Sequence, residues 1–544
     1  MATTSQAHPE AQRAWEFWID RGGTFTDVVA RAPGGSIVTA KLLSENPGQY
    51  DDAAVAGIRH ILGLGKDEPL PAARITAVKL GTTVATNALL ERKGAPTLLV
   101  TTKGFADQLR IGTQHRPKLF VRKIELPPQL YASVIEADER VLADGTIAHA
   151  LDEEALLAQL REAYAKGLRA AAIVFMHGYR FPEHEKRAAA CARRAGFTQI
   201  SVSHEISPLI RFIGRGDTSV ADAYLSPVLR AYVERVASHL KGIPLYFMQS
   251  NGGLAHADHF RGRDAVLSGP AGGVVGHVET ARAEGFEKLI GFDMGGTSTD
   301  VSHFAGAYER VQETSIAGVR LRVPMLSVNT VAAGGGSILV AEHGRLRAGP
   351  ESAGAMPGPA CYRNGGPLTV TDANLMTGRI HPDFFPALFG KCGTEKLDRV
   401  VVEEKFGELA ARFGKPPEAM ANGFLDIAVD NMAQAIRKIS VARGYDVTEY
   451  TLSCFGGAGA QLACRVADAL GMESIFIHRF AGVLSAFGIG HTGIRVQHDA
   501  AILAPLSPET EARAQEIAAE LAARAHADVA AQGASTDAIT TLST

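Results

Sequence analysis

The stretch Asp20-Arg-Gly-Gly-Thr-Phe-Thr-Asp-Val28 returns as Asp293-Met-Gly-Gly-Thr-Ser-Thr-Asp-Val301, identical at seven of nine positions and 273 residues further along, from position 20 to position 293. Chance produces such a match in at most about a few per cent of random chains of this composition. Apolar residues precede both copies, so each copy predicts a strand, a Gly-Gly turn and a second strand. The repeat therefore predicts two similar halves arranged as a pseudo-symmetric pair of lobes.

The repeated hairpin has the residue types that bind phosphate and Mg²⁺. A Gly-Gly pair lets the backbone adopt positive φ and approach a ligand, so that successive N–H groups point into one concavity. Asp20 and Asp293 place a carboxylate where a Mg²⁺ ion on those phosphates would lie. The remaining candidate residues are the glycines and threonines of the two turns: Gly22, Gly23, Thr24, Thr26, Gly295, Gly296, Thr297 and Thr299. The alternative is that D-x-G-G is only a type I′ hairpin turn.

A third glycine cluster consists of Gly456, Gly457 and Gly459. It follows the strand-like run 451–455 and precedes a helical stretch, 461–470. A nucleotide approaches backbone closely at such a turn, but the same pattern is typical of a turn that packs a helix. Both interpretations stay open at this point.

Length and composition limit the function classes. A chain of 544 residues predicts about three or four domain-sized units. The formal net charge of −3 disfavours binding to nucleic acid or to an anionic membrane. Five scattered cysteines without a C-x-x-C pair fit neither a disulfide framework nor a zinc finger. No secretory signal and no apolar run of about 18 residues is visible, so we expect a cytoplasmic protein.

Apolar periodicity and glycine punctuation predict α/β units. We expect a helix over 152–167, a strand over 168–176, a helix from Pro182 to Gly196 and a strand over 199–203. A further helix is predicted from an N-cap at Ser226 and Pro227 in the first turn to Gly242, followed by a strand over 244–248. The glycine- and proline-rich region 332–367 predicts a functional loop without regular elements. Near the end we expect a helix over 508–533 and a strand-like run over 539–542.

From Trp18 to Thr492 the sequence resembles the hydantoinase/oxoprolinase family, and within it the ATP-dependent 5-oxoprolinases. The resemblance rests on the first hairpin and on seven further motifs. They are Lys41-Leu-Leu-Ser-Glu-Asn-Pro47, Gly81-Thr-Thr-Val-Ala-Thr-Asn-Ala-Leu-Leu90, Asn87-Ala-Leu-Leu-Glu-Arg-Lys-Gly94, Gln249-Ser-Asn-Gly-Gly253, Ser268-Gly-Pro-Ala-Gly-Gly273, Ala332-Ala-Gly-Gly-Gly-Ser-Ile338 and Gly349-Pro-Glu-Ser-Ala-Gly-Ala-Met-Pro-Gly-Pro-Ala-Cys-Tyr362.

The resemblance implies an α/β fold with two RNase H-like lobes of the actin, hexokinase and Hsp70 ATPase type around a nucleotide cleft. The expected domains are 16–205, 206–492 and a truncated C-terminal segment, 493–544. The implied reaction is ATP-dependent opening of a cyclic amide, with ATP and Mg²⁺ as cofactors and phosphorylation of the lactam oxygen. On this basis we assign Asp20 and Asp293 to the metal, and Thr24, Thr26, Thr297 and Thr299 to the phosphates. Asp27 and Asp300 either share that role or fix the hairpins.

Arg116 is the candidate for the substrate carboxylate, because arginine binds carboxylates in a bidentate manner. Gln114 and Asn251 are the candidate amide partners. The chain departs from the family at Ala460 and Leu462, where glycine and histidine are usual. It also ends where such enzymes continue into a second half, so we expect a fragment or one subunit that works with a hydantoinase B-like half; a homo-oligomer stays open.

Two kinds of alternative function remain open from the sequence. One is another branch of the same family, either a hydantoinase subunit or a ketone carboxylase subunit. The other is an actin- or chaperone-like nucleotide switch, whose product is a conformational change.

Overall fold

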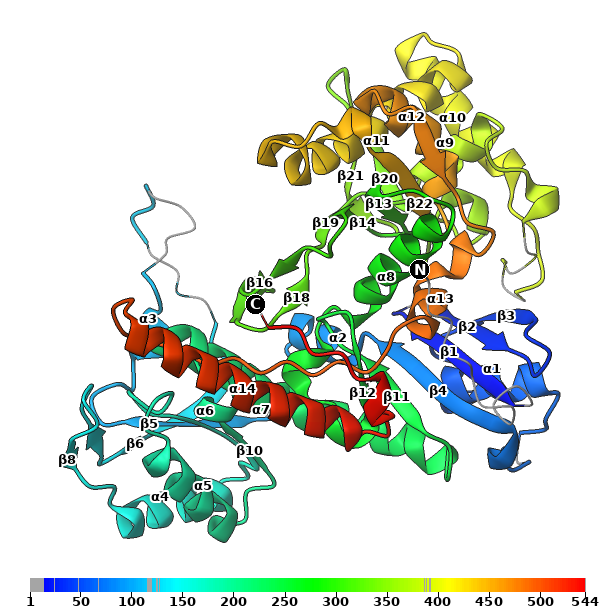
Figure 1. The fold of residues 1–544 in the computed structure, drawn as a ribbon. Helices are drawn as coiled ribbons and strands as arrows, with labels where there is room; N and C mark the ends of the chain where they lie inside the picture. Colours follow the sequence, from blue (N-terminus) through cyan, green and yellow to red (C-terminus); the bar gives the residue numbers. More distant parts are fainter. Residues whose placement is uncertain are drawn as a thin grey trace.

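A computed structural model describes residues 14–543 except positions 24, 47, 67, 115–119, 124–125, 127, 386, 388 and 391–392. The fold is α/β, with two mixed sheets and one parallel sheet as its largest layers. Figure 1 shows the two mixed sheets on either side of a central helix pair, and the parallel sheet set apart beside a long helix.

The first mixed sheet contains the first copy of the hairpin. Its strands are β1 (Trp15–Arg21), β2 (Phe25–Arg31), β3 (Ile37–Leu43), β4 (Ile75–Thr82), β11 (Leu245–Met248) and β12 (Leu254–His256). The strand order is β12-β11-β4-β1-β2-β3. Strand β2 is antiparallel to β1 and β3 is antiparallel to β2, whereas β4 and β11 are parallel to β1. Helices α1 (Ala53–Leu62) and α2 (Val84–Leu90) contribute buried residues to its core.

The second mixed sheet contains the second copy and repeats the first one strand by strand. Its strands are β13 (Lys288–Met294), β14 (Thr299–Ala305), β19 (Asn329–Val331), β22 (Thr451–Phe455) and β23 (Ser474–Phe476). The order β19-β14-β13-β22-β23 has the same strand directions as β3-β2-β1-β4-β11. The repeat seen in nine residues of sequence is therefore a repeat of a five-stranded unit.

A parallel sheet is inserted between β4 and β11. It is formed by β5 (Thr97–Thr102), β6 (Tyr131–Ala137), β9 (Ala170–Val174) and β10 (Gln199–Val202), in the order β10-β9-β5-β6. Helices α4 (Glu153–Ala165) and α5 (Glu183–Ala195) cover it, which confirms the alternation expected between 152 and 203. The smaller elements of this insertion are α3 (Gln108–Ile111), β7 (Arg140–Val141), β8 (Ile147–His149) and α6 (Ser203–Ile206).

The helix expected to begin at Ser226 begins earlier, so that prediction is wrong at its start. Helix α7 (Phe212–His239) runs through Pro227, and the Ser226 hydroxyl donates to Asp222 Oδ1 instead of capping a helix. The upstream turns were missed because polar side chains are buried there. The hydroxyls of Thr218 and Ser219, for example, donate to carbonyls one turn back. The N-terminal half of α7 packs on the parallel sheet and its C-terminal half on the first mixed sheet.

Two helices connect the mixed sheets. They are α8 (Ser268–Ala283) and α13 (Leu484–Gly490), which lie together in the centre of Figure 1. Their contact is between backbones, because a Cβ added at Gly488 would lie 2.1 Å from Gly272 O and 2.4 Å from Gly276 N. Helix α13 also packs on β1, and Lys79 Nζ donates to Gly490 O over 2.7 Å. A segment near the end of the chain thus completes the first half.

The region expected to lack regular elements contains a hairpin, which corrects that prediction. Strands β20 (Ser337–Glu342) and β21 (Arg345–Ser352) pair antiparallel. The pattern was missed because Gly334–Gly336 precede the first strand and Gly349 and Pro350 lie within the second. Helices α9 (Val370–Met376), α10 (Arg399–Phe413), α11 (Pro417–Ile439) and α12 (Ala463–Leu470) complete the largest core of the second half.

An extension leaves the second sheet between β14 and β19 and reaches toward α3 and α7 (Figure 1). It consists of β15 (Arg310–Val311), β16 (Thr314–Ile316), β17 (Val319–Leu321) and β18 (Met325–Leu326). At the end of the described chain, helix α14 (Pro508–Ala530) confirms the helix expected there. The strand-like run 539–542, which is expected to order only beside a neighbouring strand, is in no strand here, and Leu542 is 79% exposed. Within the described part of the chain, no helix has the length and apolar character to cross a membrane.

Candidate active site

The two hairpins close in the same way. Gly22 N donates to Phe25 O, and Gly295 N donates to Ser298 O at the equivalent position, both over 3.0 Å. None of the four turn glycines has positive φ, so the expected backbone conformation, and with it the type I′ turn, is wrong. A Cβ added at Gly23 or Gly296 would meet nothing within 4 Å. Since neither φ nor the described packing requires glycine at these two exposed positions, the bare backbone favours close approach by a ligand.

The aspartates of the two hairpins form one acidic group. Within each hairpin the two carboxylates are cross-strand neighbours, Asp20 opposite Asp27 and Asp293 opposite Asp300. Burial, and then repulsion by Asp27, raises the pKa of Asp20 to about 7, against the opposing effect of Lys41. The pKa of Asp293 is raised well above its usual value by burial, then by Asp300 and by both aspartates of the first hairpin. The carboxylates of the two hairpins therefore lie close enough to interact.

The acidic group fits a hard divalent cation. Asp20 remains partly exposed as a residue, but its Oδ1 atom is buried and has no hydrogen-bond partner among the described residues. No cluster of three or more metal-ligating side chains occurs in the described part of the chain. Mg²⁺ bound to phosphates takes one or two protein carboxylates and completes its shell with phosphate oxygens and water, so the unpartnered Asp20 Oδ1 fits such an ion.

Backbone closely approaches Asp20, which together with Asp293 we call the inner aspartates of the hairpins. A Cβ at Gly81 would lie 3.1 Å from Asp20 Oδ1, and one at Gly269 would lie 3.4 Å from the same atom. The Ser268 hydroxyl donates to Thr82 O over 2.8 Å, which joins the start of α8 to the end of β4. These two glycines were quoted in family motifs but were not assigned to the site from the sequence.

The third glycine cluster is divided between the site and the core. Gly456 has φ +83°, and a Cβ there would lie 2.3 Å from Asp293 Oδ1. Gly457 faces open space, whereas Gly459 is buried, with its Cβ position 2.8 Å from Cys454 Sγ. The cluster thus lies beside the second hairpin and also packs α12. Nucleotide contact by these glycines stays a prediction.

The threonines have different surroundings. Thr26 is buried and its hydroxyl lies 3.0 Å from Ser44 Oγ, while Ser44 donates to Gly22 O over 2.6 Å. Thr299 is buried and donates to Ala333 O over 2.6 Å. These two hydroxyls hold the hairpins to neighbouring loops, and their contact with phosphate stays a prediction. Thr297 is exposed at its turn, and Thr24 lies outside the described residues.

The loop around Gly334 supports the second hairpin from behind. Gly335 N donates to Gly295 O over 3.0 Å, and Gly336 N donates to Gly296 O over 2.6 Å. A Cβ at Gly334 would lie 2.8 Å from the Gly296 carbonyl group. Part of the region expected to be a functional loop therefore holds the carbonyls of the turn, which leaves the other face of the turn to a ligand.

Asp27 and Asp300, which we call the outer aspartates, have partners in β3 and β19. Lys41 forms an ion pair with Asp27, its neighbour across β2 and β3. Thr330 donates to Asp300 Oδ1 over 2.6 Å from the equivalent position of β19. These contacts favour a structural role for Asp27 and Asp300. Lys41 was missed as a site residue because its position depends on strand register, although it begins a quoted family motif.

Of the substrate residues expected from the sequence, the structure describes Gln114 and Asn251, which lie in different loops. Gln114 is exposed in the loop after α3, with φ +58°, and Arg116 lies outside the described residues. Asn251 lies in the loop after β11, where its side chain bonds Gln249 Oε1 and Gly253 N. Their role in substrate binding stays a prediction.

Comparison with known proteins gives a consistent result. Residues 16–196 match the hydantoinase/oxoprolinase N-terminal region and residues 215–498 match hydantoinase/oxoprolinase. The chain is 45% identical to 5-oxoprolinase 1 of Arabidopsis thaliana, covering 87% of this chain and 41% of that protein. It is 35% identical to caprolactamase subunit alpha of Pseudomonas jessenii, covering 88% and 70%. The chain thus spans about two fifths of the length of the 5-oxoprolinases it matches.

Solved structures have the same fold. The crystal structure of ATP-dependent caprolactamase from Pseudomonas jessenii superposes with a TM-score of 0.82 at 32% identity, covering 95% of this chain and 77% of that one. Nucleotide-free acetone carboxylase has a TM-score of 0.75 at 22% identity, over 96% and 77% of the chains, which shows a common fold. Sequence and structure together show that this chain belongs to the hydantoinase/oxoprolinase family.

Proposed function

We propose that this chain is the ATP-binding, phosphorylating part of an enzyme that hydrolyses a cyclic amide, with 5-oxo-L-proline converted to L-glutamate as the reaction. The observation that carries the proposal is the pair of like hairpins whose carboxylates lie close together, since Asp20 and Asp27 of the first hairpin help to raise the pKa of Asp293 in the second. Identity of 41–45% to proteins named 5-oxoprolinase supports this substrate. The caprolactamase relative supports the same reaction class, because caprolactam is also a cyclic amide.

The two mixed sheets form two RNase H-like lobes of the actin, hexokinase and Hsp70 ATPase type in this proposal. Support comes from the identical order and directions of β3-β2-β1-β4-β11 and β19-β14-β13-β22-β23. We keep the division into a first lobe, 16–205, a second lobe, 206–492, and a C-terminal segment, 493–544, with one addition. Strands β11 and β12, from 245 to 256, and helix α13 belong spatially to the first lobe.

The chemistry requires activation because amide resonance protects a five-membered lactam from water. Transfer of the γ-phosphoryl group of ATP forms a bond between phosphorus and the lactam oxygen and releases ADP. A first water adds at the activated carbon and the ring C–N bond breaks, which leaves a free amine and an acyl phosphate. A second water then adds at the same carbon and phosphate leaves. The net reaction consumes ATP, lactam and two waters, and yields ADP, phosphate and the amino acid. The lactam oxygen has no proton to remove, so positioning and electrostatics matter more than a strong base.

The hairpins supply that environment. Asp20 and Asp293 would hold Mg²⁺, which when bound would neutralise charge on the phosphates. The open backbone at Gly23 and Gly296 would let N–H groups approach phosphate oxygens, with Thr297 as an exposed hydroxyl donor. Asp20 also lies beside the start of α8, at Gly269, where the helix dipole favours negative charge.

A second protein part completes the enzyme in this proposal. The 5-oxoprolinases that match are about two and a half times as long as the aligned part, so we propose that a hydantoinase B-like half, linked or separate, completes ring opening. The chain alone is expected to form ADP slowly in the presence of 5-oxoproline and to release little glutamate.

The test measures ADP and glutamate together, for the chain alone and after addition of the second half. The substrates are 5-oxoproline, hydantoin, caprolactam and acetophenone. Restored glutamate release with 5-oxoproline supports the proposal. Stoichiometric glutamate from the chain alone contradicts the division of labour, and ADP formation that no small substrate stimulates, but a protein or peptide does, favours a nucleotide switch.

A further inference from the structure

A cavity of about 470 Å³ lies far from the hairpins in the sequence and shares no residue with them. Its walls come from three parts of the chain. Phe105 and Met176 follow the parallel strands β5 and β9, the first turn of α7 contributes Phe212 and Ile213, and the extension contributes Arg322. The cavity therefore lies at the carboxyl edge of a parallel sheet, where open α/β sheets bind ligands.

The cavity combines apolar walls with clustered positive charge. Arg211, Arg320 and Arg322 line it, together with a single acid, Glu313. Arg320 is paired with Asp217. The Asp217 carboxylate accepts a hydrogen bond from Arg320 Nε over 2.8 Å and forms an ion pair with Nη2 over 2.7 Å. Asp499 also acts on Arg322, so three carboxylates lie near the three arginines, but only Asp217 is paired directly with one of them. Guanidinium groups without a carboxylate partner can bind an anion.

Two of the three arginines have donors to spare. Arg320 is fully engaged, because its Nη1 atom also donates to Thr113 Oγ1 over 2.9 Å. Arg322 uses only Nη1, which donates to Ile210 O over 2.7 Å, and its backbone N–H donates to Thr218 Oγ1. The side chain of Arg211 is exposed and makes no hydrogen bond or ion pair within the described part of the chain. Burial lowers the pKa of Arg322, Glu313 and Asp499 oppose that shift, and Arg211 adds to it, so Arg211 and Arg322 are close enough to repel.

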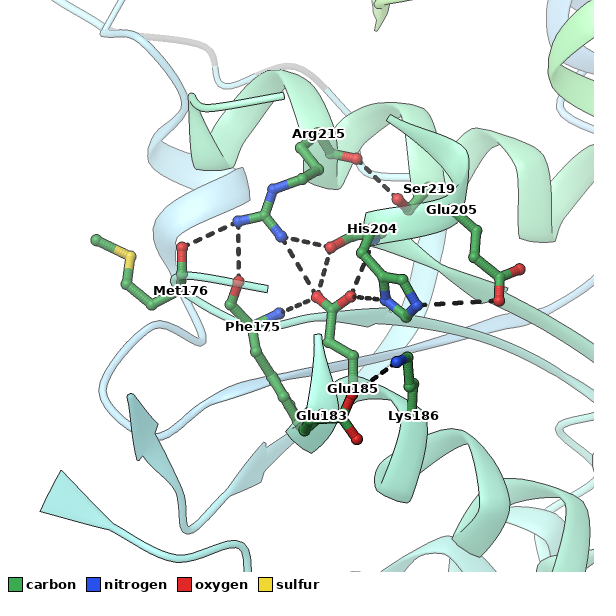
Figure 2. A network of polar contacts seen from close by, with 10 residues as sticks. Phe175, Met176, Glu183, Glu185, Lys186, His204, Glu205, Arg215 and Ser219 are labelled. Carbon is green, nitrogen blue, oxygen red and sulfur yellow. Dashed lines mark hydrogen bonds and ion pairs between the residues drawn. The ribbon is translucent and has the colours of Figure 1, made fainter. Parts of the chain in front are cut away.

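The wall of the cavity at Met176 is held by a buried polar network, shown in Figure 2. Arg215 is fully buried and donates through Nη2 to Phe175 O and Met176 O, over 2.8 and 3.0 Å. Its Nη1 atom lies 3.3 Å from Glu185 Oε1, and the same carboxyl oxygen accepts from Phe175 N over 2.8 Å. The loop that carries Met176 is thereby held to the first turns of α7. A wall of this kind is preorganised and needs little ordering when a ligand binds.

We propose that this cavity binds a small organic carboxylate with an apolar body. The carboxylate lies between the guanidinium groups of Arg211 and Arg322, and the body lies against Phe105, Phe212 and Met176. Arg320 is a positioning residue that joins the extension to α7 and α3 through Asp217 and Thr113. Because Arg320 and Arg322 lie on the extension and the other walls on the parallel sheet and the start of α7, an occupied cavity ties the extension to the parallel sheet.

Binding is tested by calorimetry without nucleotide, so the result does not depend on the proposed function. The probes are hexanoate, hexanamide, inorganic phosphate, 5-oxoproline and glutamate. Hexanoate should bind at least tenfold more tightly than hexanamide or phosphate. Equal binding of hexanamide would show that the arginines do not anchor the ligand, and equal binding of phosphate would remove the role of the apolar wall. Tighter binding of 5-oxoproline or glutamate than of hexanoate would identify the substrate or the product as the natural occupant.

Variants locate the site. Arg211→Met and Arg322→Met should each weaken hexanoate at least tenfold, while Arg513→Met, at an exposed arginine of α14, leaves affinity unchanged. Arg211→Met removes no internal hydrogen bond among the described residues, so it remains informative if Arg322→Met fails to fold. Asp20→Asn should retain hexanoate binding, because it changes only the hairpin site. Unchanged affinity in Arg211→Met and Arg322→Met, or no binding to the unmodified chain, would overturn the proposal.

Discussion

The two hairpins have the same turn but different charge balance. In the first, Lys41 lies opposite Asp27 and forms an ion pair with it. In the second, the equivalent strand position is Thr330, which offers Asp300 a neutral hydroxyl. Burial and Asp27 raise the pKa of Asp20 to about 7, and burial together with three aspartates raises the pKa of Asp293 well above its usual value. The second hairpin therefore depends more strongly on a cation brought by the ligand.

Replacing the inner aspartates should have the largest effect. Asp20→Asn and Asp293→Asn should each lower kcat for ATP hydrolysis by at least about a hundredfold, because each removes a charge from the metal and phosphate environment. Circular dichroism checks that the fold is intact, and Asp138→Asn, at an exposed ion pair with Lys103, is the matched control. Near-normal rates in both variants would show that the two aspartates serve only the turns.

Alanine substitutions at Gly456, beside Asp293, and at Gly81, beside Asp20, compare how much stability each hairpin loses when a Cβ is added next to its aspartate. Gly456→Ala places a Cβ 2.3 Å from Asp293 Oδ1 and 2.6 Å from Met294 O, at φ +83°. Gly81→Ala, outside the positive-φ region, meets a flexible end of Ile489 at 2.8 Å and Asp20 Oδ1 at 3.1 Å. We expect a loss of about 2–4 kcal/mol in unfolding free energy for the first and about 1 kcal/mol for the second. Urea denaturation measures both, and equal losses would contradict the difference.

The asparagine variants should also melt at a higher temperature than the unmodified chain in EDTA at pH 8. Both carboxyl groups have raised pKa values in the folded state, so their ionisation at that pH opposes folding. We expect a gain of about 1–2 kcal/mol, larger for Asp293→Asn, since one pKa unit corresponds to about 1.4 kcal/mol. Differential scanning calorimetry measures the gain. Lower melting temperatures in both variants would mean that the carboxylates stabilise the hairpins.

Sequence reasoning predicted the hairpins well and their surroundings less well. The repeat around Asp20 and Asp293 is local, so nine residues were enough to indicate both strands and the turn. The start of α7 was missed because buried Arg215 and Ser219 break the apolar period, and their satisfied hydrogen bonds are visible only in the fold. The position of Lys41 opposite Asp27 depends on the register between β2 and β3, which the pattern of a single strand does not contain.

The smallest expected effect separates Lys41 from Thr330. Lys41→Met removes a cation that lowers the pKa of Asp20, Asp27 and Asp293 alike, so the site becomes more negative and ADP affinity in Mg²⁺ should fall by up to about tenfold. Thr330→Val removes one hydrogen bond to Asp300 and leaves the net charge unchanged, so it should cost about 1–2 kcal/mol of stability but change ADP affinity less than twofold.

Because the Lys41 side chain is 44% exposed, added salt should screen its contribution. Calorimetric titration at about 50 and 300 mM salt measures both effects, with the Lys41→Met difference shrinking at the higher concentration. Equal affinity changes in the two variants, independent of salt, would mean that the first hairpin uses Lys41 only as a structural partner of Asp27, and the charge difference between the hairpins would have no part in binding.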